Sequence, residues 1–348
     1  MPDAPLLHDL ACVIHAHSRH SDGTGTIPQI AVAARRAGVD AVLMTDHDTL
    51  AGRSDEGWHG PVLVLVGEEI SPPGRDHTLA FGVEQPVRHR GLSAAEICAE
   101  VAAQGGVSFA AHPFSHGSEA FPRFGTGTPF TDLDAPALTG IELWSFVTDT
   151  AESLAGFGEV IGFIRKPGRF LGTPPQRNLD EWDRLCERRR LVAIGGVDAH
   201  QIGLKVGPYV PLRLMSYRRS FSHLRTHVLT ERLPTGALEH DRAQVLAALA
   251  EGRCYLAVDS LAPARGFAFW AEGGSTVAPM GAEVAAGTWT LRARVPRPAQ
   301  LRLLAAGSEI VTAQGGELDH TVTEAGAYRI EAHLDGRAWI VSNPVYVR

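Results

Sequence analysis

Short apolar runs alternate with amphipathic segments over the first part of the chain. The pattern opens with an apolar run over 11–17, an amphipathic stretch over 27–37 and a second apolar run over 40–45. Within the amphipathic stretch, apolar side chains recur at the spacing of one helical face, at Ile27, Ile30, Ala31, Ala34 and Ala37. Gly38 follows directly, which is typical of a helix end. These residues predict a strand, a helix and a second strand, which together make one β-α-β unit.

The alternation continues along the chain and predicts a barrel. Further apolar runs of strand length cover 61–67, 78–83, 107–111, 140–145 and 191–197. Ser93, followed three residues later by Glu96, forms a capping-box pattern that predicts the start of a helix. Helices are also expected near 151–164 and 178–190. About seven strands joined by helices are typical of an α/β barrel of the TIM type, and roughly 260 residues are enough for one.

Past Gly266 the pattern changes to alternating apolar and polar residues, separated by glycine, proline and aspartate. This period of two predicts a small all-β sandwich. We therefore expect a barrel domain over 1–262 and an accessory β-sandwich over 263–348, which packs on the barrel or joins two chains in a homo-oligomer. Segment 113–139, rich in glycine, proline, serine and phenylalanine, is expected to be a long loop over the barrel mouth that can act as a lid.

Composition narrows the class of protein. With 348 residues, of which 44% are hydrophobic and 20% charged, the chain has the composition of a water-soluble protein of two domains. A formal net charge of −7 argues against binding duplex nucleic acid, which needs a basic face. Apolar runs are strand-length and the start lacks a signal-peptide pattern, so we expect no membrane span and a cytoplasmic location. The four cysteines form no C-x-x-C pair and are expected to be buried thiols.

Histidine and carboxylate side chains stand at the ends of the predicted strands. In chain order they are His15 and His17, Asp46 and His47, Glu68, His112, and Asp198 with His200. Because each parallel strand of such a barrel delivers its C-terminal end to the same rim, these side chains are expected to meet there. His77 precedes its strand, 78–83, instead of following it. If that strand runs antiparallel to 61–67, His77 reaches the same rim.

Imidazole and carboxylate are ligands that divalent transition metals bind readily. His15 and His17 lie two residues apart on a strand end, so they point to the same side and can bind one ion. A carboxylate shared by two ions lets both ions polarise a phosphoryl or carbonyl oxygen. A His-x-His pair alone is a weak signal, whereas the ordered set of strand-end ligands is a strong one. The neighbouring carboxylates Asp46 and Glu69 are expected to orient ligating histidines rather than to bind an ion.

Several motifs, in this order, resemble the polymerase and histidinol phosphatase (PHP) superfamily. They are HAHSRHSDGT, VDAVLMTDHDT, GEEIS, GRDHTLAFG, AHPF and GVDAH, between residue 8 and about residue 205. The resemblance implies a distorted (β/α)7 barrel whose rim holds two to three zinc, manganese or iron ions and hydrolyses phosphoesters. The resemblance implies that one ion is bound by His15, His17, Glu68 and Asp198. It implies that a second ion shares Glu68 and is also bound by His77 and His112. It implies that a third ion is bound by Asp22, His47 and His200. Asp22 stands where some members have histidine.

The C-terminal part resembles one branch of that superfamily. TVAPMGAEV, LRLLAAG, AGAYRIEAHL and WIVSNPVYV are similar to the tail of the CehA/McbA-like branch, whose named members hydrolyse aryl carbamates. The function implied first is a metal-dependent phosphoesterase that hydrolyses a small phosphomonoester or phosphodiester. A carbamate or carboxylic ester hydrolase with the same metal site is the alternative. A regulatory or structural metal-binding module is a third interpretation.

The expected mechanism is attack on phosphorus by a metal-bound hydroxide, formed from water whose pKa the ions lower toward about 7. Glu68, Asp198 and His200 are the expected catalytic residues, and Asp198 or His200 could pass a proton to the leaving group. Arg177 and Lys205 are candidates for binding the remaining charge of the substrate, with solvated surface charge as the alternative interpretation of both. The expected partner is a small-molecule phosphate or ester substrate.

Overall fold

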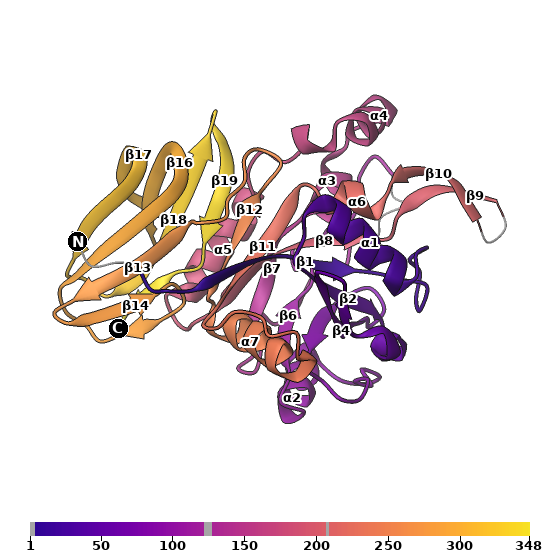
Figure 1. Ribbon diagram of the computed structural model, residues 1–348, viewed down its shortest axis with the longest axis horizontal. Coiled ribbons are helices and arrows are strands. Elements are labelled where there is room, and N and C mark those ends of the chain that lie inside the picture. The colour runs from indigo at the N-terminus through magenta and orange to yellow at the C-terminus, as the bar shows by residue number, and fades with distance from the viewer. Residues whose placement is uncertain (1–3, 122–126, 207–208) are drawn as a thin grey trace. The chain divides into compact units, whose positions relative to one another are not determined.

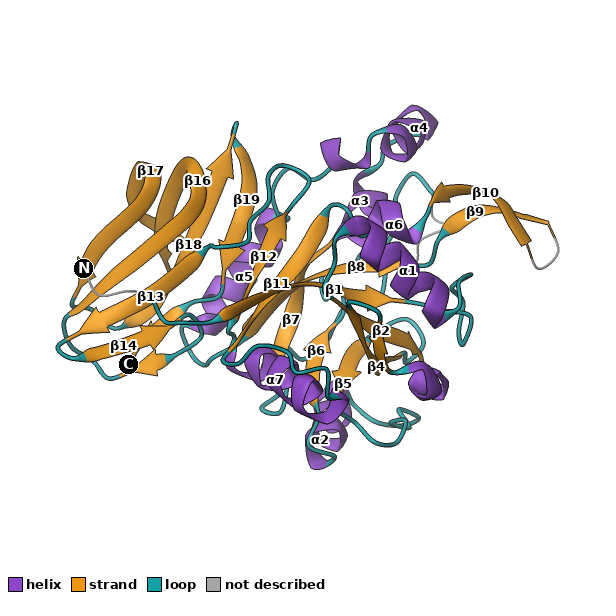
Figure 2. Cartoon of the chain, viewed as in Figure 1, coloured by secondary structure: helices purple, strands orange, loops and turns teal. Residues whose placement is uncertain are grey.

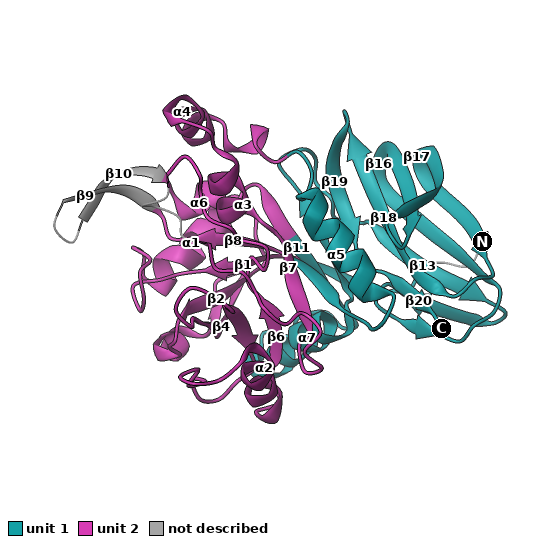
Figure 3. Ribbon diagram, turned by 180° about the vertical axis from the view of Figure 1, so that it is seen from behind, with its two compact units in different colours: residues 1–10, 172–194, 226–348 teal, residues 11–171, 195–225 magenta. Residues whose placement is uncertain are grey.

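The computed structural model describes residues 4–121, 127–206 and 209–348, with only the backbone described in 202–206 and 209–214 (Figure 1). The chain divides into two compact units, coloured separately in Figure 3. One unit consists of Met1–Leu10, Gly172–Ile194 and Thr226–Arg348, and the other of Ala11–Leu171 and Gly195–Arg225. This division differs from the predicted boundary between residues 262 and 263, because the chain passes from one unit to the other more than once.

Seven strands form a barrel that agrees with the predicted α/β architecture. In chain order they are β1 (His8–Ala16), β2 (Ala41–His47), β4 (Val62–Ile70), β5 (Thr78–Phe81), β6 (Val107–Ala110), β7 (Gly140–Ser145) and β8 (Val192–Ala199). Neighbours pair in parallel in the order β8, β1, β2, β4, and β6 pairs in parallel with β7 (Figure 2). β5 runs antiparallel to both β4 and β6. This pairing confirms that the start of 78–83 returns to the rim at which the parallel strands end.

Two helices of the barrel begin and end where the sequence predicts. α1 (Ile27–Ala37) ends at Gly38, whose φ of 72° is the left-handed conformation that glycine adopts without strain. α2 (Ala94–Ala103) begins with the predicted capping box, in which Ser93 and Glu96 make both reciprocal hydrogen bonds. α1 contacts β2 and β4 through its apolar face. The helix therefore covers the outside of the strands that carry the first candidate ligands.

The region near 151–164, predicted as one helix, forms two. α3 (Phe146–Ser153) and α4 (Phe157–Arg165) are separated because the backbone is extended at Gly156. The remaining elements of this unit are η1 (Ala51–Asp55), β3 (Gly57–His59), η2 (Pro167–Arg169), β9 (Ile202–Val206), β10 (Tyr209–Met215) and α6 (Tyr217–Ser220). In the predicted loop 113–139, the described residues contain no helix or strand element.

The other unit consists mainly of antiparallel strands. Its helices are α5 (Gln176–Cys186), close to the predicted 178–190, and α7 (Leu238–Glu251). The strands are β11 (Leu224–Thr230), β12 (Cys254–Val258), β13 (Ala268–Gly273), β14 (Thr276–Pro279), β15 (Glu283–Val284), β16 (Trp289–Ala305), β17 (Ser308–Val322), β18 (Gly326–Leu334), β19 (Arg337–Ser342) and β20 (Val345–Val347). The register of the β16–β17 hairpin shifts between Arg294 and Ala299. β16 pairs with β13 before this shift and with β18 after it.

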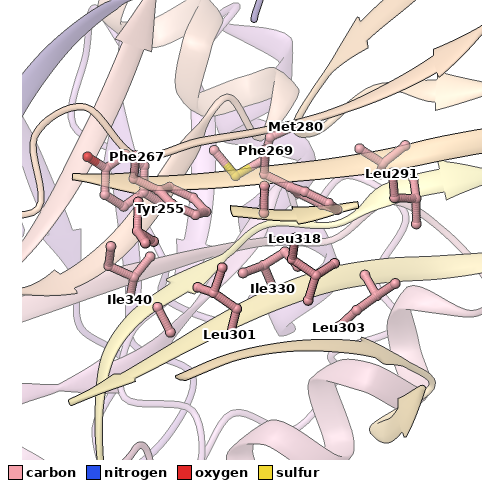
Figure 4. Close-up of a cluster of buried hydrophobic side chains, with 14 of the residues drawn as sticks. Tyr255, Phe267, Phe269, Met280, Leu291, Leu301, Leu303, Leu318, Ile330 and Ile340 are labelled. Carbon is pink, nitrogen blue, oxygen red and sulfur yellow. The ribbon is translucent and has the colours of Figure 1, made fainter. Parts of the chain in front are cut away.

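The strands of this unit enclose an apolar core (Figure 4). Side chains such as Leu291, Leu301 and Ile330 are completely buried in it. β12 belongs to the same sheet because it pairs antiparallel with β19. The amide of Asn343 also donates hydrogen bonds to the backbone oxygens of Ala193 and Cys254. These hydrogen bonds help to explain why segments 172–194 and 226–262, which were expected in the barrel domain, belong to the same compact unit as the C-terminal strands.

The cysteines are the buried thiols that the sequence predicts. All four are buried and stand as thiols: Cys12, Cys98, Cys186 and Cys254. Burial raises the pKa of the Cys186 and Cys254 thiols to about 12, so both are protonated at neutral pH. As for membrane segments, none of the helices in the described ranges has the length and apolar character needed to cross a bilayer.

A buried histidine in the β-rich unit gives a prediction about stability and pH. His227 Nδ1 lies 2.7 Å from Asp9 Oδ1, and His227 Nε2 lies 3.3 Å from both carboxylate oxygens of Asp259. Burial alone would lower the pKa of His227, but the two carboxylates outweigh it and raise the pKa to about 9. The stabilisation is therefore complete below the unfolded pKa of about 6.5 and is lost as the pH rises through about 9.

We expect His227→Gln to lower the melting temperature at pH 6 by an amount that shrinks at pH 9.5. The shift in pKa corresponds to on the order of 3 kcal/mol of stability at low pH. Melting curves of both proteins at pH 6, 7.5 and 9.5 would measure this difference. A gap between the two proteins that is the same at all three pH values would contradict a protonated, carboxylate-paired His227.

Candidate metal centre

Six histidines and three carboxylates gather at the rim where the parallel strands end. They are His15, His17 and Asp22 from β1 and the loop after it, His47 from β2, Glu69 from β4, His77 before β5, His112 after β6, and Asp198 and His200 from β8 and the residues after it. His15, His112 and Asp198 have positive φ angles of 69°, 30° and 52°. Such backbone strain costs about 1–3 kcal/mol per residue and is concentrated at functional sites. The fold therefore holds these three side chains in place at a cost in stability.

Glu69 is the carboxylate at the centre of the cluster. It is 1% exposed, and its two oxygens contact five imidazoles, two from the end of β1 and one from each of three other segments. Oε2 lies 3.2 Å from His15 Nε2, 3.3 Å from His17 Nε2 and 3.3 Å from His47 Nδ1, and Oε1 lies 2.8 Å from His77 Nδ1 and 3.3 Å from His112 Nε2. Burial raises the pKa of Glu69, but the surrounding imidazoles outweigh it and hold the pKa well below its usual range. Glu69 is therefore an anion placed to be shared between neighbouring ions.

Asp198 is the second carboxylate of the cluster, and its side chain is mostly buried, with 16% exposed. Its Oδ1 lies 3.4 Å from His15 Nε2 and 3.3 Å from His17 Nε2. Its Oδ2 accepts a hydrogen bond of 2.6 Å from the hydroxyl of Thr148, on α3. Burial raises the pKa of Asp198, but the neighbouring histidines, His15 above all, bring it well below the usual value. One oxygen is thus fixed by Thr148 and the other faces the histidines.

A third group of donors lies around Asp22, which is more exposed to solvent. The Asp22 side chain is 56% exposed and lies 3.1 Å from His200 Nε2, 3.7 Å from His47 Nε2 and 3.8 Å from His17 Nδ1. Burial alone would lower the pKa of His200, but Asp22 and Asp198 raise it to about 9. These residues form the outer side of the cluster, where solvent can reach the donors.

Hydrogen bonds turn several histidines so that Nε2 faces a carboxylate. The acceptors for Nδ1 are Glu142 Oε1 for His15 (3.0 Å), Ser71 Oγ for His47 (2.7 Å), Thr128 Oγ1 for His112 (3.2 Å) and the backbone oxygen of Asp198 for His200 (3.2 Å). With the proton held on Nδ1, the lone pair of Nε2 is free to bind a metal ion. This is the arrangement in which metal-ligating histidines are usually found.

His17 gives the clearest sign that the donors suit a metal ion. It is completely buried, yet neither ring nitrogen has a hydrogen-bond partner among the described residues. Buried polar atoms are normally paired, because leaving one unpaired costs about 1–3 kcal/mol. Burial lowers the pKa of His17 and keeps the ring neutral. A bound divalent ion would use the lone pair that no protein group satisfies.

The spacing of the donor atoms also fits divalent ions. Ligand atoms about 2.1 Å from an ion stand about 3.0–3.4 Å apart in octahedral or tetrahedral geometry. The distances from the histidines to Glu69 Oε2 and Asp198 Oδ1 given above fall mainly in this range. Four overlapping groups could each hold an ion: His17, Asp22, His47 and His200; His15, His112 and Asp198; His15, His17 and Glu69; and Glu69, His77 and His112.

Glu68 is not part of this cluster, so the sequence expectation for it was wrong by one residue. Its Oε1 accepts a hydrogen bond of 2.7 Å from the backbone N–H of Val87. Burial raises the pKa of Glu68 to about 7. Adjacent strand residues point to opposite faces, and β4 is buried on both, so its uniformly apolar pattern does not reveal which glutamate faces the rim. Glu69, instead of Glu68, lies where the shared carboxylate was expected.

Asp46 also has a different role from the expected one. Its Oδ1 accepts hydrogen bonds of 2.7 Å from the backbone N–H of Ser18 and the hydroxyl of Ser21, and its Oδ2 accepts one of 2.7 Å from the Ser18 hydroxyl. Asp46 therefore holds the loop between His17 and Asp22 instead of orienting a histidine. Glu69, expected to orient histidines, lies among the donors themselves.

Glu142 is a site residue that the sequence analysis missed. It lies on β7, is completely buried, and accepts hydrogen bonds from His15 Nδ1 (3.0 Å) and from the backbone N–H of His112 (2.7 Å). One carboxylate thus positions two candidate ligands. The available signal was an acidic residue in the middle of the apolar run 140–145, because a buried carboxylate needs polar partners.

Gly196, on β8, leaves the space that Glu142 occupies. A Cβ at this position would lie 1.7 Å from Glu142 Oε1. We therefore expect Gly196→Ala to displace Glu142 and to weaken metal binding about 10- to 100-fold, as loss of an outer-shell partner of a ligating histidine does. The adjacent Gly195 offers a matched control, because its Cβ would only meet the side chain of Leu224 at 3.3 Å. Competition titration with a chelator would compare them, and equal affinities would contradict the role of Glu142.

A cavity of about 710 Å³ opens onto the cluster. Histidines and carboxylates of the centre line one part of it, including His47, Glu69 and His200. Side chains of α3 and α4 line another part. The cavity provides the space in which a small molecule could reach the centre.

The two candidate substrate-binding cations remain predictions. Arg177 is exposed on α5, in the β-rich compact unit, and is absent from the described residues that line the cavity. Lys205 lies on β9, where its side chain falls outside the described part of the chain.

Comparisons with known proteins give limited matches. No family model matches the chain. Over 80 residues it is 38% identical to the phosphoribosyl 1,2-cyclic phosphate 1,2-diphosphodiesterase of Eggerthella lenta, and the match covers 21% of this chain and 30% of that protein. The chain thus spans less than a third of this relative.

Two solved structures match the chain with low identity. One is a two-domain protein from Bacteroides vulgatus that contains a predicted PHP-like metal-dependent phosphoesterase, with a TM-score of 0.47, 16% identity, and coverage of 99% of this chain and 97% of that one. The other is a proposed metal-dependent phosphoesterase from Bifidobacterium adolescentis, with a TM-score of 0.38, 19% identity, and coverage of 58% of this chain and 92% of that one.

Proposed function

We propose that this protein is a metal-dependent phosphoesterase of the PHP superfamily that hydrolyses a small phosphomonoester or phosphodiester. The observation that carries the proposal is the buried carboxylate of Glu69, whose two oxygens contact five imidazoles from four segments of the chain. A carboxylate in such surroundings is suited to being shared by two divalent ions. Asp198 and Asp22 extend the donor set on either side.

Divalent ions, when bound, would supply Lewis-acid chemistry, because they polarise phosphoryl oxygens and lower the pKa of water. The protein side chains would hold the geometry around them. Thr148 fixes one oxygen of Asp198, so that the other faces His15 and His17. Glu142 holds the proton on His15 Nδ1 and leaves Nε2 available as a ligand.

In the proposed hydrolysis, a bond forms between a water oxygen and phosphorus, and the bond between phosphorus and the leaving alcohol oxygen breaks. The leaving oxygen then takes up a proton. We assign this proton transfer to His200, which lines the cavity and whose Nε2 would carry the proton, 3.1 Å from Asp22, when no ion is bound between His17, Asp22, His47 and His200. No serine or cysteine nucleophile is needed, because water is the nucleophile.

A carbamate or carboxylic ester hydrolase is the second candidate. The observation that favours it is the cavity lining, which includes no lysine or arginine among the described residues that could bind the extra charge of a phosphate. The same donor set would suit attack of water on a carbonyl carbon.

Release of p-nitrophenol from four reporters would separate these candidates. The reporters are a phosphomonoester, a phosphodiester, an acetate and a carbamate, each tested with manganese-loaded and chelator-stripped protein. We expect metal-dependent turnover of a phosphate reporter. Turnover restricted to the acetate or carbamate would overturn it in favour of the second candidate, and no turnover of any reporter would count for a non-catalytic metal-binding module.

A further inference from the structure

One wall of the cavity next to the metal centre is apolar. It is formed by two short helices that follow β7. The apolar side chains that α3 and the residue after it contribute are Val147, Ala151 and Leu154, and those from α4 include Val160, Phe163 and Ile164. These residues recur at intervals of three or four, so each helix turns one apolar face toward the cavity. A wall of this size favours an apolar part of a ligand over a polar one.

Aromatic side chains support this wall and mark its outer edge. Phe163 packs edge-on against Phe146, with ring centroids 5.7 Å apart, which fixes its position on the wall. Phe157, at the start of α4, is 78% exposed although it lines the cavity, and it packs edge-on against Phe121 at 5.2 Å. The exposed ring of Phe157 adds to the apolar surface at the cavity edge that a ligand could cover.

The charged groups in the described lining of the cavity disfavour a second anionic group on the ligand. Away from the histidines, the acidic group on the wall is Glu152, which is held by hydrogen bonds from the Ser115 hydroxyl and from the backbone N–H groups of His116 and Gly117. The described lining contains no lysine or arginine that could neutralise another phosphate or carboxylate. A nucleotide or a sugar bisphosphate would therefore meet negative charge or apolar surface beyond the metal centre.

The wall is also connected to the centre through α3. Thr148 lines the cavity between Val147 and the cluster, and its hydroxyl donates to Asp198 Oδ2. A ligand with its ester group at Glu69 and Asp198 would therefore extend directly along α3 and α4.

We infer that the substrate is an amphiphilic ester, with one anionic or polar ester head at the metal centre and a bulky apolar group of several carbons on the wall formed by α3 and α4. This inference rests on the proposed function for the identity of the head group. The apolar group is recognised by burial alone, so selectivity follows its size more than its shape.

The test uses a series of n-alkyl phosphates from ethyl to octyl and the corresponding n-alkylphosphonates, which are not hydrolysed. For manganese-loaded protein, kcat/KM for the phosphates and affinity for the phosphonates, measured by calorimetry, are expected to rise about two- to fourfold per methylene until the wall is covered. Ile164→Asn should flatten this dependence on chain length, because it places an amide on the wall. Ile161→Asn is the matched control: Ile161 is on the same helix, is 57% exposed and is absent from the described lining, so the wild-type slope should remain.

The outcomes separate this inference from the proposed function. Turnover of all phosphates without dependence on chain length would overturn the inference and leave the phosphoesterase intact. A chain-length dependence of phosphonate affinity without any turnover would support the apolar site and overturn the phosphoesterase. If Ile164→Asn and Ile161→Asn reduced the dependence on alkyl chain length equally, the assignment of the apolar binding wall to the cavity-facing side of α4 would be overturned.

Discussion

Replacing Glu69 by glutamine is expected to abolish shared metal binding and to lower turnover about 100- to 1,000-fold or more, the scale on which a single essential electrostatic group acts. The physical reason is that Glu69 supplies the negative charge between five imidazoles. A neutral amide would leave the ions with less compensating charge and would place an N–H₂ group toward some of the donors. Metal content by mass spectrometry and kcat for the best reporter would be measured on the same preparation.

The neighbouring Glu68 provides the control for this experiment. Glu68→Gln keeps an oxygen that can accept the hydrogen bond from Val87, and it changes the charge of a group whose pKa is already about 7. We expect metal content and kcat within about twofold of the wild-type protein, since the side chain contacts none of the donors in the described cluster. If the Glu68 variant lost its metal and the Glu69 variant kept it, the assignment of Glu69 would fail.

Removal of the metal ions is expected to lower the melting temperature of the unit that holds the site by about 10 °C. An ion present at about 1,000 times its dissociation constant stabilises the folded state by about 4 kcal/mol, and each kcal/mol shifts the melting temperature of a domain of this size by about 2–4 °C. The loss also reflects repulsion between the carboxylates of Glu69 and Asp198, which both lie 3.3 Å from His17 Nε2 and which the ions would neutralise. Calorimetry with manganese or with excess chelator would give the shift.

The Glu69→Gln variant again supplies the comparison. Because it is expected to bind little metal, its melting temperature should be almost the same with chelator as with manganese. A melting temperature of the wild-type protein that chelator does not change would contradict the view that the donors hold ions when the protein is folded.

The sequence predicted which segments reach the site, because the signals are local. An apolar run that ends in histidine or aspartate places that residue at the end of a strand, and parallel strands share their C-terminal rim. For this reason His15, His47 and Asp198 lie together as expected. The antiparallel pairing of β5 with β4, which returns His77 to the rim, could be inferred from the position of one histidine.

The choice between Glu68 and Glu69 could not be made from the pattern, because it depends on which face of a strand points inward. An alternating strand would have revealed this, but every residue of β4 is buried. Glu142 could not be predicted for a related reason. It positions His15 and His112 through hydrogen bonds, and both residues are distant from it in the sequence. The split of the compact units likewise depends on long-range pairing, such as that of β12 with β19.

The measurement that tests the central claim most directly is anomalous X-ray diffraction from crystals of manganese-loaded protein, recorded at the manganese absorption edge. The account predicts at least two anomalous peaks, each about 2.1 Å from oxygens of Glu69 or Asp198 and from histidine Nε2 atoms of the cluster. Peaks beside Glu68, or the absence of any peak at the rim in crystals whose protein contains manganese, would contradict a metal centre built around Glu69.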